Sequence, residues 1–348
     1  MYPVREIVFK NDLKATNEYN LSLLVPVYNS EKYIRKCLNS LVNQNTNFKY
    51  EIILVDDGSS DRSAEIIDEY EKLYDFVFIY HQKNSGTSAA RNKAVRLARG
   101  EYIGFIDNDD FVEPNYVDLL LSKAYETNAD IVRCGHNRFD VQKNEIISSR
   151  TYKDVILEGD IGSEILNISG FVWEGISKRS LWNDCTFPEG YWFEDMITHL
   201  VLMRKAERIV CLKEVLYYYN IHQTNAFKTV WKNNDIKCID QLYLVELLLK
   251  QYEYLGKQKM LAYTVIHECG EVLWLRIRRL KSNLQKDIFN AAAALVTTAL
   301  NGEKEQFDNI SEYEKLMFDI MKKRSFHAWQ MLCCAKMLET KRKNEIGR

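Results

Sequence analysis

A cluster of carboxylates in the first third of the chain is the clearest candidate for chemistry. Asp107, Asp109 and Asp110 lie within four positions, at the end of the strand-like run 101–107. Carboxylates this close repel one another unless a cation is bound, and Mg²⁺ and Mn²⁺ prefer oxygen ligands of this kind. On a continuing strand, Asp107 and Asp109 point to the same side. The spacing favours a metal site over the alternative, an acidic surface turn.

A second acidic pair is a candidate for ligand binding. Asp56 and Asp57 end another strand-like run, 51–57, where a carboxylate is costly unless it meets hydrogen-bond donors or a ligand. Asp57 could accept a hydrogen bond from the imide N–H of uracil. Asp61 follows in the same turn, and we expect it to cap the next helix instead.

A third acidic pair, Glu194 and Asp195, stands at the start of a helix-like segment, 193–207. Acidic side chains at a helix start cap the helix or stabilise its dipole, which is the structural interpretation. The functional interpretation is a general base. A helix start lowers the pKa of a carboxyl group and a neighbouring acid raises it, so the sequence leaves both interpretations open.

Two turn motifs could contact a nucleotide. Pro26 and Tyr28 end the first strand-like run, and Tyr28 could offer its ring face to a base; a simple strand–turn–helix connection is the alternative. Gly86 precedes a predicted helix, whose free N–H groups suit an anion. Arg91 lies about one turn inside that helix, where it could contact a nucleotide diphosphate or be a solvated cation.

The elements that position these motifs follow from the apolar pattern, which alternates between strand and helix periods. Short β-branched runs separated by segments of helical spacing predict βαβ units and a mostly parallel sheet. Four motifs follow the first four strands, at the edge where open α/β sheets bind ligands. The predicted strands are 21–27, 51–57, 76–81, 101–107 and 130–135.

The second half of the chain changes character. All four prolines and ten of the fourteen glycines precede residue 191. We therefore expect an α/β domain over 1–228 and an all-helical domain over 229–348. Before the boundary, the pattern predicts a sheet extension over 136–190 with a helix near 161–168, the helix 193–207 and a strand 215–223; after it, helices at 229–255, 258–280, 284–300, 303–323 and 325–341.

Composition narrows the class of protein. The chain has 47 basic and 49 acidic residues and a net charge of −2, whereas a nucleic-acid-binding protein usually carries a strong basic excess. The eight cysteines contain no C-x-x-C pair and predict reduced thiols. Neither a secretory signal nor an apolar stretch of about 18 residues is found in the sequence, which favours a cytoplasmic location.

Taken in order, the segments VPVYNSEKYI, ILVDDGSSDRS, NSGTSAARNKAV, ARGEYIGFIDNDD and FED resemble glycosyltransferase family 2 over roughly residues 20–225. The resemblance implies a GT-A fold, which has a Rossmann-like, mostly parallel sheet. It also implies inverting transfer of a sugar from a nucleotide-sugar donor, with a UDP-sugar favoured and Mn²⁺ or Mg²⁺ as cofactor.

The same resemblance implies a role for each matching residue. The D-x-D motif spans Asp107, Asn108 and Asp109, with Asp109 as the direct metal ligand. Asp195 is the implied catalytic base, and Glu194 is a secondary candidate. His222 could contact phosphate or metal, or be a structural histidine. The implied nucleotide site comprises Pro26, Tyr28 and Asp57 for the nucleoside and Asn84, Gly86 and Arg91 beside them.

Two departures from the family pattern bear on the substrate. Relatives often carry a Trp-x-Lys-Leu-Tyr-like segment where this chain has Trp173 to Lys178, so the basic residue is displaced and contacts to the donor sugar or acceptor stay open. The Gln-x-x-Arg-Trp motif of processive members is not found. We therefore expect addition of one sugar to a glycan, lipid-linked or protein-linked acceptor in surface-polysaccharide or glycoconjugate synthesis.

Two other functions remain as alternatives. A nucleotidyltransferase also needs a metal and a nucleotide, but the expected Gly-rich, basic triphosphate loop near the first strand is missing. A catalytically silent partner of a glycosylation complex is disfavoured by the intact Asp107, Asp109 and Asp195. Residues 321–348 carry eight Lys and Arg and could lie on the inner membrane surface. A solvated helix packed on the domain or on a second subunit of a homo-oligomer is the other interpretation.

Overall fold

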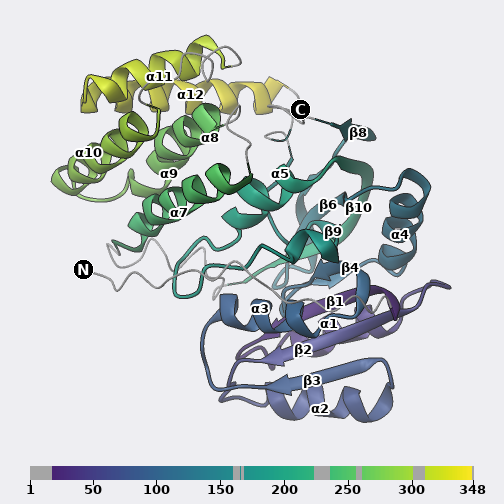
Figure 1. Ribbon diagram of the computed structural model, residues 1–348. Coiled ribbons are helices and arrows are strands. Elements are labelled where there is room, and N and C mark those ends of the chain that lie inside the picture. The colour runs from purple at the N-terminus through teal and green to yellow at the C-terminus, as the bar shows by residue number, and fades with distance from the viewer. Residues whose placement is uncertain are drawn as a thin grey trace. The chain divides into compact units, whose positions relative to one another are not determined.

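The computed structural model describes residues 18–159, 165, 168–222, 236–255, 261–300 and 310–346. Its internal contacts divide the chain into two compact units (Figure 1). The first comprises Met1–Gly190 and Glu194–Asn225, and the second comprises Tyr191–Phe193 and Ala226–Arg348. The predicted helix near 161–168 lies outside the described residues except for positions 165 and 168.

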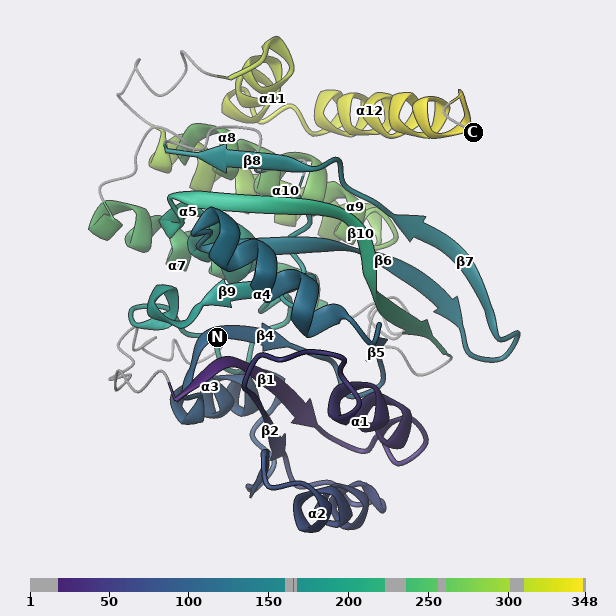
Figure 2. The ribbon, with the colours of Figure 1, turned by 90° about the vertical axis from the view of Figure 1, so that its right-hand side faces the viewer.

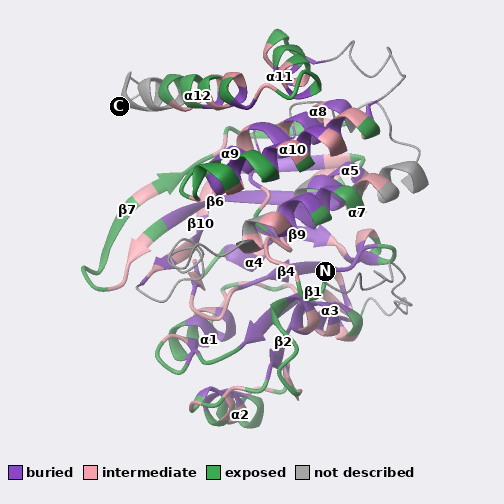
Figure 3. Ribbon diagram, turned by 90° about the vertical axis from the view of Figure 1, so that its left-hand side faces the viewer, coloured by how far each residue is buried: buried purple, intermediate pink, exposed green. Residues whose placement is uncertain are grey.

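The first unit begins with four parallel strands in the order β3-β2-β1-β4. The apolar runs of β1, β2 and β4 are buried on both faces, as parallel strands covered by helices must be, whereas β3 at the end of the strand order is half-buried (Figure 3). Leu23, Leu24 and Val25 of β1 are fully buried. The elements are β1 (Tyr19–Val27), α1 (Ile34–Val42), β2 (Tyr50–Asp56), α2 (Ser63–Leu73), β3 (Val77–His81), α3 (Thr87–Leu97) and β4 (Gly100–Phe105).

The sheet then continues with a different pattern of pairing. Strand β9 (Gly175–Lys178) inserts between β4 and β6 (Ile131–Asp140) and is antiparallel to both. Beyond β6 lies β10 (Arg208–Ile221), which is parallel to β6. The predicted strands 130–135 and 215–223 are therefore present, but β6 ends later and β10 begins earlier than expected. Figure 2 shows β6 and β10 in the same sheet as β1, β2 and β4.

The predicted sheet extension over 136–190 is confirmed. Besides β9 it contains β7 (Glu145–Arg150), which pairs with β6, and β8 (Val155–Glu158), which pairs with β10. The short β5 (Phe111–Val112) pairs with β10, and α4 (Tyr116–Thr127) follows it. The predicted helix 193–207 is present as a π-helical turn, Thr198–Leu202, that leads into α5 (Met203–Lys205).

Apart from Tyr191–Phe193 and the turns that join its helices, the described residues of the second unit are helical. An aromatic cluster forms its core, in which Trp329 packs 4.9 Å from Phe289 and 5.4 Å from Trp274 between ring centroids. No described helix is long and apolar enough to cross a membrane. The helices are α7 (Asp240–Leu255), α8 (Leu261–His267), a π-helical turn (Glu268–Val272), α9 (Leu273–Ile277), α10 (Ser282–Ala299), α11 (Glu312–Lys322) and α12 (Phe326–Ile346).

Candidate active site

The carboxyl ends of β1, β2 and β4 bring the predicted nucleoside residues to one edge of the sheet. The β1–β2 register pairs Val27 with Asp56, and the backbone N–H of Asp57 donates to the Val27 carbonyl at 2.8 Å. From the end of β4, the Asn108 amide donates to the Pro26 carbonyl at 2.8 Å. Tyr28 is 50% exposed, which leaves its ring free to receive a planar group.

Asp57 is buried and has partners within the chain. Its Oδ1 accepts hydrogen bonds from the Gln82 side chain and the Ser85 backbone, both at 2.8 Å, and its Oδ2 accepts one from the Gly86 backbone at 2.8 Å. A carboxylate offers about four acceptor positions, so one position remains for a ligand. Asp57 therefore orders the loop before α3 as well as facing the site.

The anion site expected at the start of α3 is thus partly filled by Asp57 itself. Its negative charge lies at the N-terminus of α3, where the helix dipole stabilises it. The loop also requires its glycines. Gly58 and Gly86 have φ of +71° and +90°, and a Cβ at Gly58 would lie 2.9 Å from the backbone nitrogen of Asn84. Asn84 itself is exposed.

The three carboxylates after β4 each have a separate partner. Asp107 pairs with Arg91 at 2.9 Å, and Asp109 Oδ2 lies 2.7 Å from His222 Nε2. Asp110, which is 1% exposed, accepts hydrogen bonds from the Tyr217 hydroxyl at 2.8 Å and the Asn220 backbone at 2.7 Å. The repulsion expected from their spacing is therefore relieved by partners from α3, from β10 and from His222, the residue after β10.

Burial changes the pKa of Asp110 and of Asp107. It raises the pKa of Asp110 well above its usual value, with the charges of Asp109 and Asp107 adding to the rise. It also raises the pKa of Asp107, against the opposing effect of Arg91. Sequence reasoning assigned no role to Asp110. The sequence shows two adjacent acids at 109–110 and three tyrosines at 217–219, but it does not relate the two runs. The pairing of β5 with β10 brings them together.

Arg91 connects the D-x-D segment with the later acidic pair. Its Nη2 donates to Asp107 at 2.9 Å and its Nη1 donates to Glu194 at 2.7 Å. The guanidinium is 6% exposed; burial would lower its pKa, but Asp107 and Glu194 raise it overall. Arg91 therefore bridges two carboxylates, and its expected contact with a diphosphate stays a prediction.

The second acid of that pair, Asp195, is half-buried next to the bridge. Its carbonyl accepts a hydrogen bond from the Thr198 backbone, at the start of the π-helical turn. Its charge also contributes to raising the pKa of Arg91, which places Asp195 within electrostatic range of the guanidinium. The residue before the pair, Phe193, has φ of +67°, a strained backbone conformation for a bulky residue.

The side chains near the D-x-D segment can be compared with the ligands that the expected metal ion requires. Within the described part of the chain, no group of three or more His, Cys, Asp or Glu side chains is arranged to hold a metal ion. Asp109 and His222 nevertheless bring an oxygen and a nitrogen ligand 2.7 Å apart, and the His222 ring stacks on Tyr33 at 4.5 Å. Mg²⁺ typically takes one or two carboxylates and completes its shell with substrate phosphates, so these residues fit a metal that arrives with a donor.

This α/β sheet, with a D-x-D segment at a strand end and an acidic pair joined to it through one arginine, has the GT-A fold. The sequence profile described as "Glycosyl transferase family 2" matches residues 22–171. The chain belongs to this family. It is 32% identical to "Glycosyltransferase GlyG" of Streptococcus pneumoniae over 221 residues, which are 60% of this chain and 73% of GlyG.

Other relatives and a solved structure agree with this assignment. The chain is 37% identical to "Putative glycosyltransferase EpsH" of Bacillus subtilis over 221 residues, covering 61% of this chain and 64% of EpsH. The fold matches the crystal structure of Staphylococcus aureus TarS 1–349 in complex with UDP-GlcNAc, with a TM-score of 0.72 and 20% identity over 92% of each chain.

Proposed function

We propose that this protein is an inverting, metal-dependent, non-processive glycosyltransferase that moves one sugar from a UDP-sugar to an acceptor hydroxyl. The observation that carries the proposal is the bridge from Asp107 through Arg91 to Glu194, because it brings the predicted donor site and the predicted base together. The UDP-GlcNAc complex of TarS, which has the same fold, supports the donor class.

The nucleoside is held at the ends of β1 and β2. Tyr28 offers an exposed ring to the uracil base, and Asp57 keeps one acceptor position for the uracil imide N–H. Asn108 fixes the Pro26 carbonyl at the end of β1. Asn84 and Gly86 border the nucleotide on a loop that Asp57 has already ordered, which lowers the entropy lost on binding.

The chemistry at the acceptor falls to Asp195. Arg91 neutralises Glu194 at 2.7 Å and so removes one of the two acids as a free base. Asp195 removes the proton from the acceptor hydroxyl as that oxygen attacks the anomeric carbon. The nucleoside diphosphate leaves from the opposite face of the sugar, which inverts the anomeric configuration.

The negative charge on the leaving diphosphate is neutralised at the end of β4. Asp109 and Asp107, with His222 as an additional ligand, would hold Mn²⁺ or Mg²⁺. A bound divalent cation supplies charge neutralisation for the diphosphate. The hydrogen bond from Asn220 to the Asp109 carbonyl keeps this segment in place independently of the ion.

The acceptor class rests on the relatives. Among them are EpsH, GlyG and a "Poly(ribitol-phosphate) beta-glucosyltransferase" of Bacillus spizizenii, which is 34% identical over 219 residues, covering 60% of this chain and 33% of that protein. The last of these names states a polymer acceptor, and it supports an acceptor in surface-polysaccharide or glycoconjugate synthesis, whether glycan, lipid-linked or protein-linked.

A screen of donor hydrolysis tests this function. UDP-, GDP- and TDP-sugars are incubated with the protein and Mn²⁺, and the released nucleotide is identified. Release of UDP from a UDP-sugar is expected. In a parallel incubation with nucleoside triphosphates and sugar phosphates, release of pyrophosphate would instead identify a nucleotidyltransferase. No turnover in either incubation would favour a catalytically silent partner.

We also propose that the C-terminal helices contact an acceptor, a membrane surface or a second subunit. On α12, Met331 and Leu338 are 69% and 62% exposed among basic residues, which supports an interfacial role for this helix and a peripheral, inner-face location. Flotation with anionic liposomes, compared between the full chain and a variant lacking 321–348, tests the membrane contact. Equal flotation of both would exclude it.

A further inference from the structure

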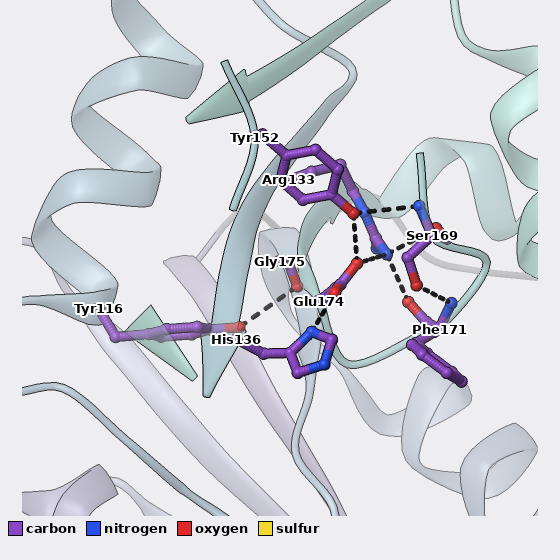
Figure 4. A network of polar contacts seen from close by, with 8 residues as sticks. All are labelled: Tyr116, Arg133, His136, Tyr152, Ser169, Phe171, Glu174 and Gly175. Carbon is purple, nitrogen blue, oxygen red and sulfur yellow. Dashed lines mark hydrogen bonds and ion pairs between the residues drawn. The ribbon is translucent and has the colours of Figure 1, made fainter. Parts of the chain in front are cut away.

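A buried ionic cluster lies in the first unit, away from the residues that the proposed function uses. We name it the Glu174 cluster; it consists of Arg133, His136, Tyr152 and Glu174 (Figure 4). Glu174 is 0% exposed and immediately precedes β9, the strand inserted next to β4. A fully buried carboxylate is costly to desolvate, so it requires partners that compensate its charge.

The Glu174 carboxylate is satisfied on both oxygens. Oε1 is hydrogen-bonded to His136 Nδ1, while Oε2 accepts from the Tyr152 hydroxyl at 2.6 Å and from Arg133 Nη2 at 3.2 Å. Burial by itself would raise the pKa of Glu174, but His136, Arg133 and Tyr152 lower it below its usual value. The carboxylate is therefore charged at neutral pH.

The cluster also fixes the backbone that leads into β9. Arg133 donates to the Ser169 carbonyl at 2.9 Å and to the Phe171 carbonyl at 2.6 Å, and the Ser169 N–H donates to the Tyr152 hydroxyl at 3.0 Å. Gly175 follows with φ of +127°, in close contact with the β6 backbone where no side chain would fit. Residues 169–175 are thus held at both ends.

Trp173 lies within this held segment and contacts the residues behind the D-x-D motif. Its ring is 5% exposed and stacks on Tyr217 at 4.5 Å between centroids, with an interplanar angle of 21°. The Tyr217 hydroxyl donates to Asp110 at 2.8 Å and accepts from the Asp107 backbone N–H at 3.1 Å. A continuous path therefore runs from Glu174 to the D-x-D backbone.

We propose that Glu174 is a positioning residue for sugar transfer: its cluster seats Trp173 against Tyr217, and Tyr217 fixes the backbone that presents Asp107 and Asp109. This inference rests on the proposed glycosyltransferase function.

A matched control separates positioning from stability. Glu51 is also 0% exposed; it accepts from Arg99 at 2.6 Å and from Ser22 at 2.6 Å, near the opposite ends of the strands from the site. Glu174→Gln and Glu51→Gln each remove a charge from a buried cluster, and both are expected to lower the urea midpoint. Only Glu174→Gln is expected to lower kcat with the identified UDP-sugar, by about tenfold or more, with Glu51→Gln within twofold.

A double-mutant cycle tests the path. If Glu174 acts through Tyr217, the reduction of kcat in Glu174→Gln/Tyr217→Phe is close to that of the more severe single variant, whereas independent effects multiply. Multiplied effects, or an equal loss in Glu51→Gln, would overturn the inference. If Glu174→Gln does not fold, Tyr152→Phe removes one hydrogen bond from Glu174 and leaves its charged partners. Wild-type kcat in that variant would overturn the inference as well.

A spectroscopic readout distinguishes failure of this inference from failure of the proposed function. The near-UV circular dichroism difference between the protein and Trp173→Phe identifies the band of the stacked ring. Glu174→Gln is expected to lose this band and Glu51→Gln to keep it. If the wild type is active and Glu174→Gln retains the band, the positioning role is refuted and the proposed function is not. A wild type inert toward every donor refutes the proposed function, and with it the role in transfer, even if the band is lost.

Discussion

Replacing Arg91 with lysine separates the two acids that its guanidinium joins. An ammonium group is a point charge and cannot span Asp107 and Glu194, which Arg91 contacts with different nitrogens at 2.9 and 2.7 Å. Removing one partner of a buried pair costs about 3–5 kcal/mol in general. The side chains of Asp107 and Glu194 are 27% and 22% exposed, and a lysine keeps one of the two contacts. We therefore expect a smaller loss in the free energy of unfolding, about 1.5–3 kcal/mol, which is the contribution of one hydrogen bond to a charged group.

The same change should affect transfer. If the lost bond supports the transition state, about 1.5–3 kcal/mol corresponds to a decrease of kcat/KM by roughly 10- to 150-fold. Stability is measured by urea unfolding and transfer by release of UDP in the presence of acceptor. Arg99→Lys, in the pair with buried Glu51, is the control and should lose stability without a comparable loss of transfer. Wild-type kcat/KM in Arg91→Lys would refute the reasoning.

Two further predictions concern the loop and the strand beside the nucleotide site. Gly58→Ala places a Cβ 2.9 Å from the Asn84 backbone nitrogen at a φ of +71°, so it should weaken UDP binding measured by calorimetry; an unchanged dissociation constant would argue against this loop as the nucleotide site. The hydrogen bond to Asp56 raises the pKa of His81, with Asp68 adding to the rise. The stabilisation that protonated His81 gives the folded state is therefore complete below the pKa of the unfolded state, about 6.5. It is lost as the pH rises through the higher pKa of the folded state. A melting-temperature difference between wild type and His81→Asn should shrink from pH 5.5 to 8.5, and a constant difference would contradict this assignment.

The sequence predicted the parallel half of the sheet well because its physical cause is local. Each strand is a short apolar run, and a strand followed by a helix pairs in parallel with the next strand. The motifs at the ends of β1, β2 and β4 therefore had to meet at one edge. The antiparallel β9 between β4 and β6 could not be foreseen, because a four-residue strand with one half-exposed end has no distinctive period.

Side-chain partners were less predictable than positions. Asp57 and Arg91 were both assigned to a ligand, yet each first meets groups of this chain: loop N–H groups for Asp57, and Asp107 with Glu194 for Arg91. These contacts join residues up to 103 positions apart and depend on the tertiary register. The place of Glu174 at the centre of a buried cluster depends in the same way on the packing of β6 against β9.

The most direct test of the account is donor binding and transfer measured side by side in Asp195→Ala. Arg91, Asp107 and Asp109 are unchanged in this variant, so the donor and Mn²⁺ should bind within a few-fold of wild-type affinity by calorimetry. The rate of transfer to the acceptor should fall by about 10²–10⁴-fold, which is the contribution of a positioned general base. Normal transfer by Asp195→Ala would contradict the assignment of the base, and Asp109→Ala, which should lose both binding with Mn²⁺ and transfer, is the matched comparison.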